Sequence, residues 1–168
     1  MIGGLVAFAW SSLSWMVLPF HEKSLTILAD PAPLLAALAP QAEKSGVYLA
    51  PNHPGGMETP FLFVAYSKEG WGGMGLTMLA ALALYGFGGF WWTWVLGKIP
   101  GLTALDSARY GAMFGLALGA LGSMPYSVWW KFPFGFSFLY LIDHVVIWSI
   151  ASPLIARWGQ ASVCALPK

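Results

Sequence analysis

Apolar runs of helical length, separated by short proline-containing connections, make up most of the chain. A helix needs about 20 mostly apolar residues to cross a hydrocarbon core about 30 Å thick. Four stretches meet this requirement: residues 2–20, 73–96, 103–124 and 134–156. The pattern predicts an all-α integral membrane protein, a four-transmembrane-helix bundle formed by residues 1–168 as one domain. Pro153 is expected to kink or end the last helix.

The segment between the first two predicted spans, residues 21–72, is more polar. Asp30-Pro31 is a typical helix start, and residues 46–50 and 61–66 have the composition of strands around a turn-rich run. We expect a small extramembrane α/β cap, with a short helix and a β-hairpin, packed on the ends of the spans. About fifty residues form a poor independent core, so the apolar side chains of the cap should be buried against one another or against a partner. These are Leu34, Leu35, Leu38, Phe61, Phe63 and Val64.

Composition supports the membrane class. The chain is 58% hydrophobic and 9% charged, whereas a soluble domain is about half apolar and about a quarter charged. A formal net charge of +1 lacks the basic footprint of a nucleic-acid-binding protein. The single cysteine, Cys164, excludes an intrachain disulfide framework. The lipid bilayer is therefore the expected partner, and nucleic acid is not.

The flanking cations predict the orientation. With four spans, the N-terminus, residues 97–102 and the C-terminus share one side, where cations cluster beside the membrane. On the other side, three of the four cations are spread over the long acidic segment 21–72, and the fourth is Lys131. The positive-inside rule then places both termini in the cytoplasm and residues 21–72 outside it. Residues 2–20 lack the basic start and cleavage site of a signal peptide, so we interpret them as a membrane helix.

Asp143 and His144 lie near the middle of the fourth predicted span, where ionisable groups are costly and point to function. Tyr140 and Ser137 precede them by one and two helical turns. Together they predict an intramembrane polar site that relays protons or binds an ion or a polar ligand. The alternative is structural, because polar contacts between helices are common in membrane bundles. In that case, Asp143 accepts a hydrogen bond from a tryptophan indole or from one of three serines on a neighbouring helix: Ser11, Ser12 or Ser14.

Gly111, Gly115 and Gly119 recur every four residues and so share one face of the third predicted span. Small residues at this spacing let two helix backbones approach closely. The row packs either on another span of this chain, for which the glycines of residues 86–89 offer a mate, or on a partner subunit.

Metal and catalytic motifs are sparse. His53 and Met57 form a soft ligand pair that would suit copper, and His21 is a further weak candidate. The sequence contains no HxxxH, HExxH or paired cysteine, no nucleophile motif and no phosphate-binding loop. It therefore requires no cofactor and predicts no enzymatic activity.

Two segments resemble small multi-pass membrane proteins of bacteria that carry no assigned activity. They are Ser14-Trp-Met-Val-Leu-Pro-Phe-His-Glu22, and Pro125-Tyr-Ser-Val-Trp-Trp-Lys-Phe-Pro133 followed by Asp143-His144. The resemblance covers most of the chain. It implies a location in the bacterial inner membrane and supplies no site.

Three functions follow as hypotheses. The first is a non-enzymatic accessory or assembly subunit of a larger membrane complex, respiratory or photosynthetic, docked through the glycine row. The second is a small oligomeric transporter or proton relay centred on Asp143 and His144. The third is a metal-binding membrane protein that uses His53.

Overall fold

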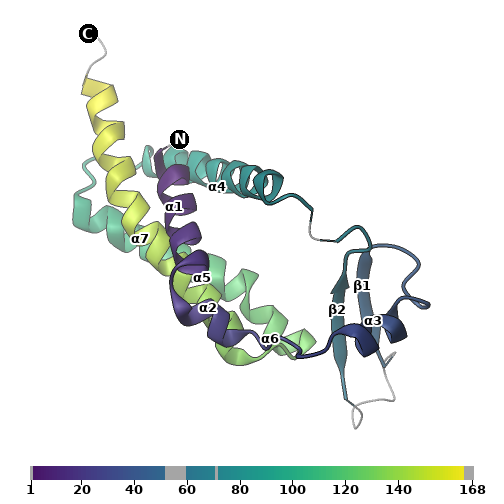
Figure 1. The fold of residues 1–168 in the computed structure, drawn as a ribbon. Helices are drawn as coiled ribbons and strands as arrows, with labels where there is room; N and C mark the ends of the chain where they lie inside the picture. Colours follow the sequence, from purple (N-terminus) through teal and green to yellow (C-terminus); the bar gives the residue numbers. More distant parts are fainter. Residues whose placement is uncertain (1, 52–59, 71, 165–168) are drawn as a thin grey trace. The chain divides into compact units, whose positions relative to one another are not determined.

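The computed structural model describes residues 2–51, 60–70 and 72–164, with side chains described as far as Trp158. It is 69% helical, with one small sheet. The chain divides into two units (Figure 1). The helical unit comprises Met1–Leu25 and Met78–Lys168, and the hairpin unit comprises Thr26–Thr77.

The first predicted span is broken into two helices, α1 (Ile2–Met16) and α2 (Pro19–Ser24). Leu18 has an extended backbone, with φ −83° and ψ 138°, and Pro19 opens α2. A proline disfavours helical geometry in the residue before it, which explains the break. The 15 residues of α1 extend about 22 Å, less than the thickness of a hydrocarbon core.

Among the described residues, two helices are long and apolar enough to cross a membrane. They are α4 (Met74–Leu96) and the stretch Phe134–Trp158 of α7 (Phe134–Cys164). Pro153 lies inside α7 without ending it. The third predicted span corresponds to α5 (Ala104–Gly122), in which Asp106, Ser107, Arg109 and four glycines reduce the apolar character. The structure therefore supports two candidate spans and does not support four. The break at Leu18 shortens the first predicted span, and the polar start of α5 lowers the hydropathy of the third.

The core of the helical unit lies where α1, α4 and α7 meet. Trp92 of α4 packs among Ile147, Trp148 and Ala151 of α7. Its ring also stacks on Phe114 of α5, with centroids 4.1 Å apart and planes 2° apart. Its indole Nε1 donates a hydrogen bond of 2.7 Å to the Ser152 hydroxyl. The C-terminal part of α4 is thus fixed to α7 by both aromatic packing and a buried hydrogen bond.

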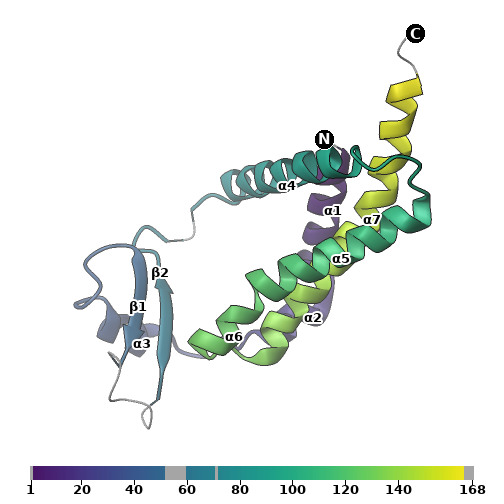
Figure 2. The same ribbon diagram turned by 180° about the vertical axis from the view of Figure 1, so that it is seen from behind.

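The glycine row of α5 packs on α7. Figure 2 shows the two helices side by side, and Gly111, Gly115 and Gly119 are all buried. A Cβ atom at Gly111 would lie 2.0 Å from the Trp148 carbonyl oxygen, and one at Gly119 would lie 2.6 Å from the Leu141 Cα. The mate of the row is therefore α7 of the same chain. The glycines of α4 instead meet α1, where a Cβ at Gly89 would lie 2.3 Å from the Gly4 nitrogen.

A short helix, α6 (Met124–Trp130), connects α5 to α7. It ends at Lys131, which has a left-handed backbone with φ 58°. The chain can then reverse direction and start α7 at Phe134, which brings α6 beside the first turns of α7.

The hairpin unit contains α3 (Ala32–Leu38) and two antiparallel strands, β1 (Gly46–Ala50) and β2 (Leu62–Tyr66). Tyr48 pairs with Val64 at the centre of the ladder. The predicted short helix and hairpin are therefore confirmed. Within the chain, Leu34, Leu35 and Phe61 are 40–50% exposed, so these three side chains are not buried against the rest of the cap. Their burial against a partner stays a prediction.

Candidate functional site

Asp143 of α7 is bound by two side chains of α1. The Ser14 hydroxyl donates to both carboxylate oxygens, at 2.8 Å and 3.1 Å. The Trp10 indole Nε1 donates to Oδ1 at 3.2 Å. Trp10 and Ser14 are four residues apart, so both face α7 from one side of α1. Asp143 therefore has both kinds of partner expected from the structural alternative, a serine and a tryptophan indole of a neighbouring helix.

The third partner of Asp143 is His21 of α2. Its Nε2 lies 2.7 Å from Oδ2 of the carboxylate. The imidazole is 2% exposed and the Asp143 side chain 13% exposed. The indole of Trp15 stacks on one face of the imidazole, with centroids 3.9 Å apart and planes 14° apart. Tyr140 approaches the imidazole edge-on at 5.7 Å. We call Asp143, His21, Ser14 and Trp10 the carboxylate cluster.

The sequence does not predict this pairing, because His21 falls in segment 21–72, which is predicted to lie outside the membrane. The break at Leu18 and the proline start of α2 instead turn His21 back towards α7. One signal was available: a carboxylate inside a helical bundle needs a partner, and His21 lies next to the first apolar stretch. The two side chains are 122 residues apart in the sequence, and no local pattern predicts a contact over that separation.

The hydrogen bonds define the chemistry of the carboxylate cluster. An ionised carboxylate accepts hydrogen bonds and donates none, which suits the three donor side chains around Asp143. If Nε2 of His21 carries the donated proton, the neutral imidazole has a bare Nδ1. That atom is buried and has no hydrogen-bond partner among the described residues. The cluster therefore has one vacant position for a proton, at a histidine nitrogen that a carboxylate orients.

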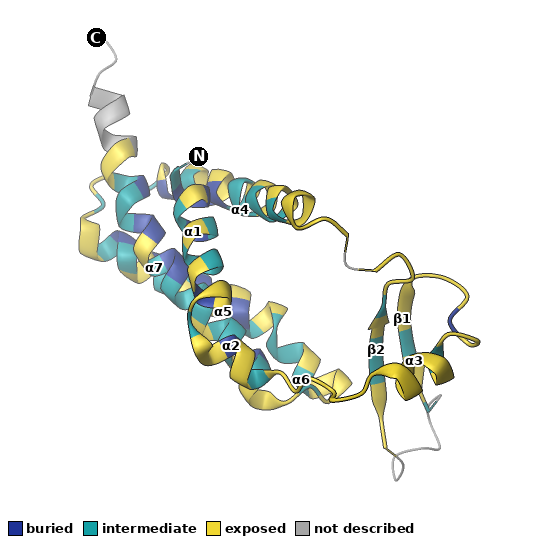
Figure 3. Cartoon of the chain, in the orientation of Figure 1, coloured by how far each residue is buried: buried dark blue, intermediate teal, exposed yellow. Residues whose placement is uncertain are grey.

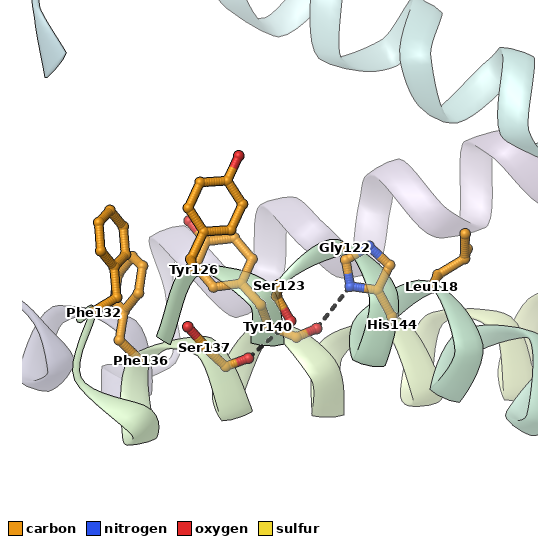
Figure 4. Close-up of a pocket in the computed structure, with 9 residues that line it drawn as sticks. All are labelled: Leu118, Gly122, Ser123, Tyr126, Phe132, Phe136, Ser137, Tyr140 and His144. Atoms are coloured by element: carbon orange, nitrogen blue, oxygen red, sulfur yellow. Dashed lines mark hydrogen bonds between the residues drawn. The ribbon is translucent and has the colours of Figure 1, made fainter. Parts of the chain in front are cut away.

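The other residues of the predicted polar site lie elsewhere. His144 does not contact Asp143; its Nδ1 is 2.7 Å from the Tyr140 carbonyl oxygen. Ser137 accepts a hydrogen bond of 2.8 Å from the Ser127 hydroxyl. Tyr140 touches the carboxylate cluster only through its ring. Asp143 thus belongs to the carboxylate cluster, whereas Ser137 and His144 line a groove beside α6 (Figure 4). Tyr140 lines this groove too and borders the cluster through its ring contact with His21.

Of the weak metal candidates, His53 and Met57 lie outside the described residues. His21 is engaged by Asp143. Among the side chains of residues 2–51, 60–70 and 72–158, no three from His, Cys, Asp or Glu are grouped so that they could hold a metal ion.

Comparison of the chain with protein families, curated proteins and solved structures finds no match.

Proposed function

We propose that this chain is a non-enzymatic integral membrane protein that takes up and passes on protons at the carboxylate cluster. The observation that carries the proposal is the contact between the Asp143 carboxylate and the buried His21 imidazole, with Nδ1 left without a partner. In this proposal, His21 replaces His144 as the partner of Asp143.

Membrane insertion is supported by the exposure of α4. Only 6% of its most apolar stretch is buried within the chain, whereas an apolar helix in the core of a soluble protein is mostly buried. Figure 3 shows α4 largely in the colours of exposed and intermediate residues. An exposed apolar surface of this size is stable in lipid and not in water. The large apolar side chains exposed on α4 include Leu76, Leu79, Leu84, Phe87, Phe90, Trp91 and Trp94.

The resemblance to bacterial proteins supports an inner-membrane location, and the flanking cations support cytoplasmic termini. The extracytoplasmic placement of residues 21–72 required the first stretch to cross the membrane. Both termini share one side whether the chain has four spans or only two, α4 and α7. The single cysteine, Cys164, tests this arrangement: an impermeant maleimide should label it in lysed cells and not in intact ones. Labelling in intact cells would refute the cytoplasmic C-terminus.

In this proposal, Asp143 lies at a depth that suits a membrane proton site. It lies nine residues after Phe134 in the candidate span, about 14 Å along the helix axis. Water is scarce at that depth, so the three donor side chains replace it in stabilising the carboxylate.

Each protonation state of the His21–Asp143 pair has one unfavourable feature. With a neutral imidazole, the buried cluster keeps one net negative charge, which is costly in a medium of low dielectric constant. With an imidazolium, that charge is neutralised, but Nδ1–H becomes a buried donor with no acceptor among the described residues, which is also costly. Neither state satisfies every group, a property suited to a site that gains and loses a proton.

The test is proton movement into liposomes that contain the purified protein and a pH-sensitive dye. Under a potassium diffusion potential, vesicles with the wild-type protein should acidify or alkalinise faster than empty ones. Asp143→Asn keeps the size of the side chain and removes the charge, so it should abolish the difference. Asp106→Asn makes the same chemical change at an exposed site on α5 and should leave the rate unchanged. Wild-type vesicles no faster than empty ones would overturn the proposal, as would full activity of the Asp143→Asn protein.

A second candidate function, an accessory or assembly subunit of a larger membrane complex, is supported by the hairpin unit. Val47 and Leu49 lie on one face of β1, and both are exposed, as are Ile27 and Leu28 before α3. Exposed apolar patches commonly mark protein interaction sites. Purification in mild detergent followed by native mass spectrometry tests this function. A partner protein in fixed stoichiometry would support it, and a chain that elutes alone would contradict it.

A further inference from the structure

The groove beside α6 is the second polar feature of the helical unit, separate from the carboxylate cluster. It has a volume of about 420 Å³, within the range of small-molecule sites, about 300–1,000 Å³. Its walls come from the C-terminal end of α5, from α6, from Phe132 in the following turn and from the first three turns of α7 (Figure 4). The lining residues are Leu118, Gly122, Ser123, Tyr126, Phe132, Phe136, Ser137, Tyr140 and His144.

His144 presents a defined hydrogen-bonding atom in this groove. Its Nδ1 is 2.7 Å from the Tyr140 carbonyl oxygen, and a carbonyl oxygen only accepts hydrogen bonds. Nδ1 must therefore carry the proton, so in the neutral imidazole Nε2 has a free lone pair. No described residue donates to Nε2: the only hydrogen bond of this side chain is the one from Nδ1. A ligand in the groove would meet an acceptor that lacks a donor.

The remaining surface of the groove is aromatic, and its serines already have partners. Consecutive rings contact one another, with centroids 5.4 Å apart for Tyr126 and Phe132 and 5.1 Å apart for Phe136 and Tyr140. The Ser123 hydroxyl is 2.7 Å from the Gly119 carbonyl oxygen and 3.0 Å from that of Ser137. Flat rings stack well on such walls. Besides His144 Nε2, the hydroxyls of Tyr126 and Tyr140 are polar groups on these walls. A phenol hydroxyl can donate as well as accept, so among the described lining side chains His144 Nε2 is the position that requires a donor.

We propose that this groove binds an apolar, ring-containing molecule with one hydroxyl group, whose hydroxyl donates to Nε2 of His144 and whose rings pack on the aromatic walls. Quinols and sterols share this chemistry, and both are soluble in lipid. The proposal goes beyond the proton function and does not depend on it, since its test measures binding and not proton movement.

The first test compares two probes on the wild-type protein in lipid nanodiscs. Naphthol has the ring system and the hydroxyl, and methoxynaphthalene has the same rings with the donor removed. One hydrogen bond is worth about 0.5–1.5 kcal/mol net, so naphthol should bind roughly two- to tenfold more tightly. Saturable naphthol binding should also perturb the nitrogen NMR signals of His144. Equal binding of the two probes, or no saturable binding, would overturn the proposal.

Two variants test whether the probes bind in the groove. His144→Phe keeps an aromatic ring and removes the acceptor, so it should abolish the preference for naphthol over methoxynaphthalene. Gly122→Leu should fill the groove and abolish binding of both probes. A Cβ atom at Gly122 meets nothing within 4 Å, so this variant should fold. Gly75→Leu, at another glycine with open space around it, is the matched control and should bind as the wild type does. Unchanged binding by Gly122→Leu would overturn the assignment to the groove.

Competition then separates the two sources of the ligand. A short-chain quinol or a sterol is added to protein saturated with naphthol, and the one that displaces it identifies the natural class. Displacement by neither would show that the groove takes up only small additives, and the proposal would fail.

Discussion

Replacing Gly115 by alanine should force α5 and α7 apart and destabilise the helical unit. A Cβ atom at residue 115 would lie 2.2 Å from the His144 carbonyl oxygen and 2.7 Å from the Val145 Cα. Both are backbone atoms of α7, so no change of side-chain rotamer relieves the contact. Non-bonded atoms pack at about 3.5–4.0 Å, and α7 would have to move by more than about 1 Å.

Two opposing effects set the size of the change. Alanine in place of glycine in a helix interior stabilises the helix by roughly 0.5–1 kcal/mol. Overpacking of a closely packed interface costs about 1–3 kcal/mol, and contact with backbone alone favours the upper end. We expect a net loss of about 2 kcal/mol in the free energy of unfolding. For a chain of this size, that lowers the melting temperature by about 4–8 °C.

Thermal unfolding in mild detergent, followed by circular dichroism, measures the effect. Gly122→Ala is the control in the same helix, because a Cβ atom there meets nothing within 4 Å. It should melt at the wild-type temperature or slightly above it. If the melting temperature of the Gly115→Ala protein equals that of the Gly122→Ala protein, the inference that α5 and α7 approach closely at Gly115 is wrong.

Three further changes are expected to have measurable effects. Trp92→Phe removes the indole hydrogen bond to Ser152 and should lower stability by about 1–2 kcal/mol; a double-mutant cycle with Ser152→Ala should show coupling between the two sites. Thr103→Ala removes the side chain that caps α5 and should cost about 1 kcal/mol, whereas Thr103→Ser should not. The Ser45 hydroxyl donates to the Glu69 carboxylate and holds the pKa of Glu69 below its ordinary value. This contact therefore stabilises the hairpin unit above the ordinary glutamate pKa and is lost as the pH falls through the lowered one. Ser45→Ala should raise the pKa of Glu69, and a carboxyl NMR titration that showed no change would contradict this.

Several local elements follow from the sequence alone. α4 begins and ends within a residue of the predicted stretch 73–96. A long apolar run bounded by glycines is typical of one continuous helix, and here the glycines mark its ends. β1 occupies residues 46–50 as predicted, and β2 begins one residue after its predicted start. In these cases, the residues that decide the structure are neighbours in the chain.

Counting apolar residues overestimated the spans, for a local reason. A run of about 20 residues is a continuous helix only if its backbone allows one, and Pro19 requires an extended Leu18. The proline that breaks the helix is visible in the sequence, but a count of apolar residues does not take it into account.

The partners of the glycine row and of Asp143 are evident only from the tertiary structure. The sequence indicated that Gly115 approaches another backbone closely and that Asp143 needs a hydrogen-bonding partner inside a bundle. It left open whether the glycine row meets a helix of this chain or of another, and it did not pair Asp143 with His21. A spacing of four residues fixes the face of a helix, and a buried charge fixes the need for a counterpart. Neither determines which of several distant segments arrives there, because that choice depends on how all the helices pack at once. The break at Leu18 and the packing of α5 on α7 made that choice here.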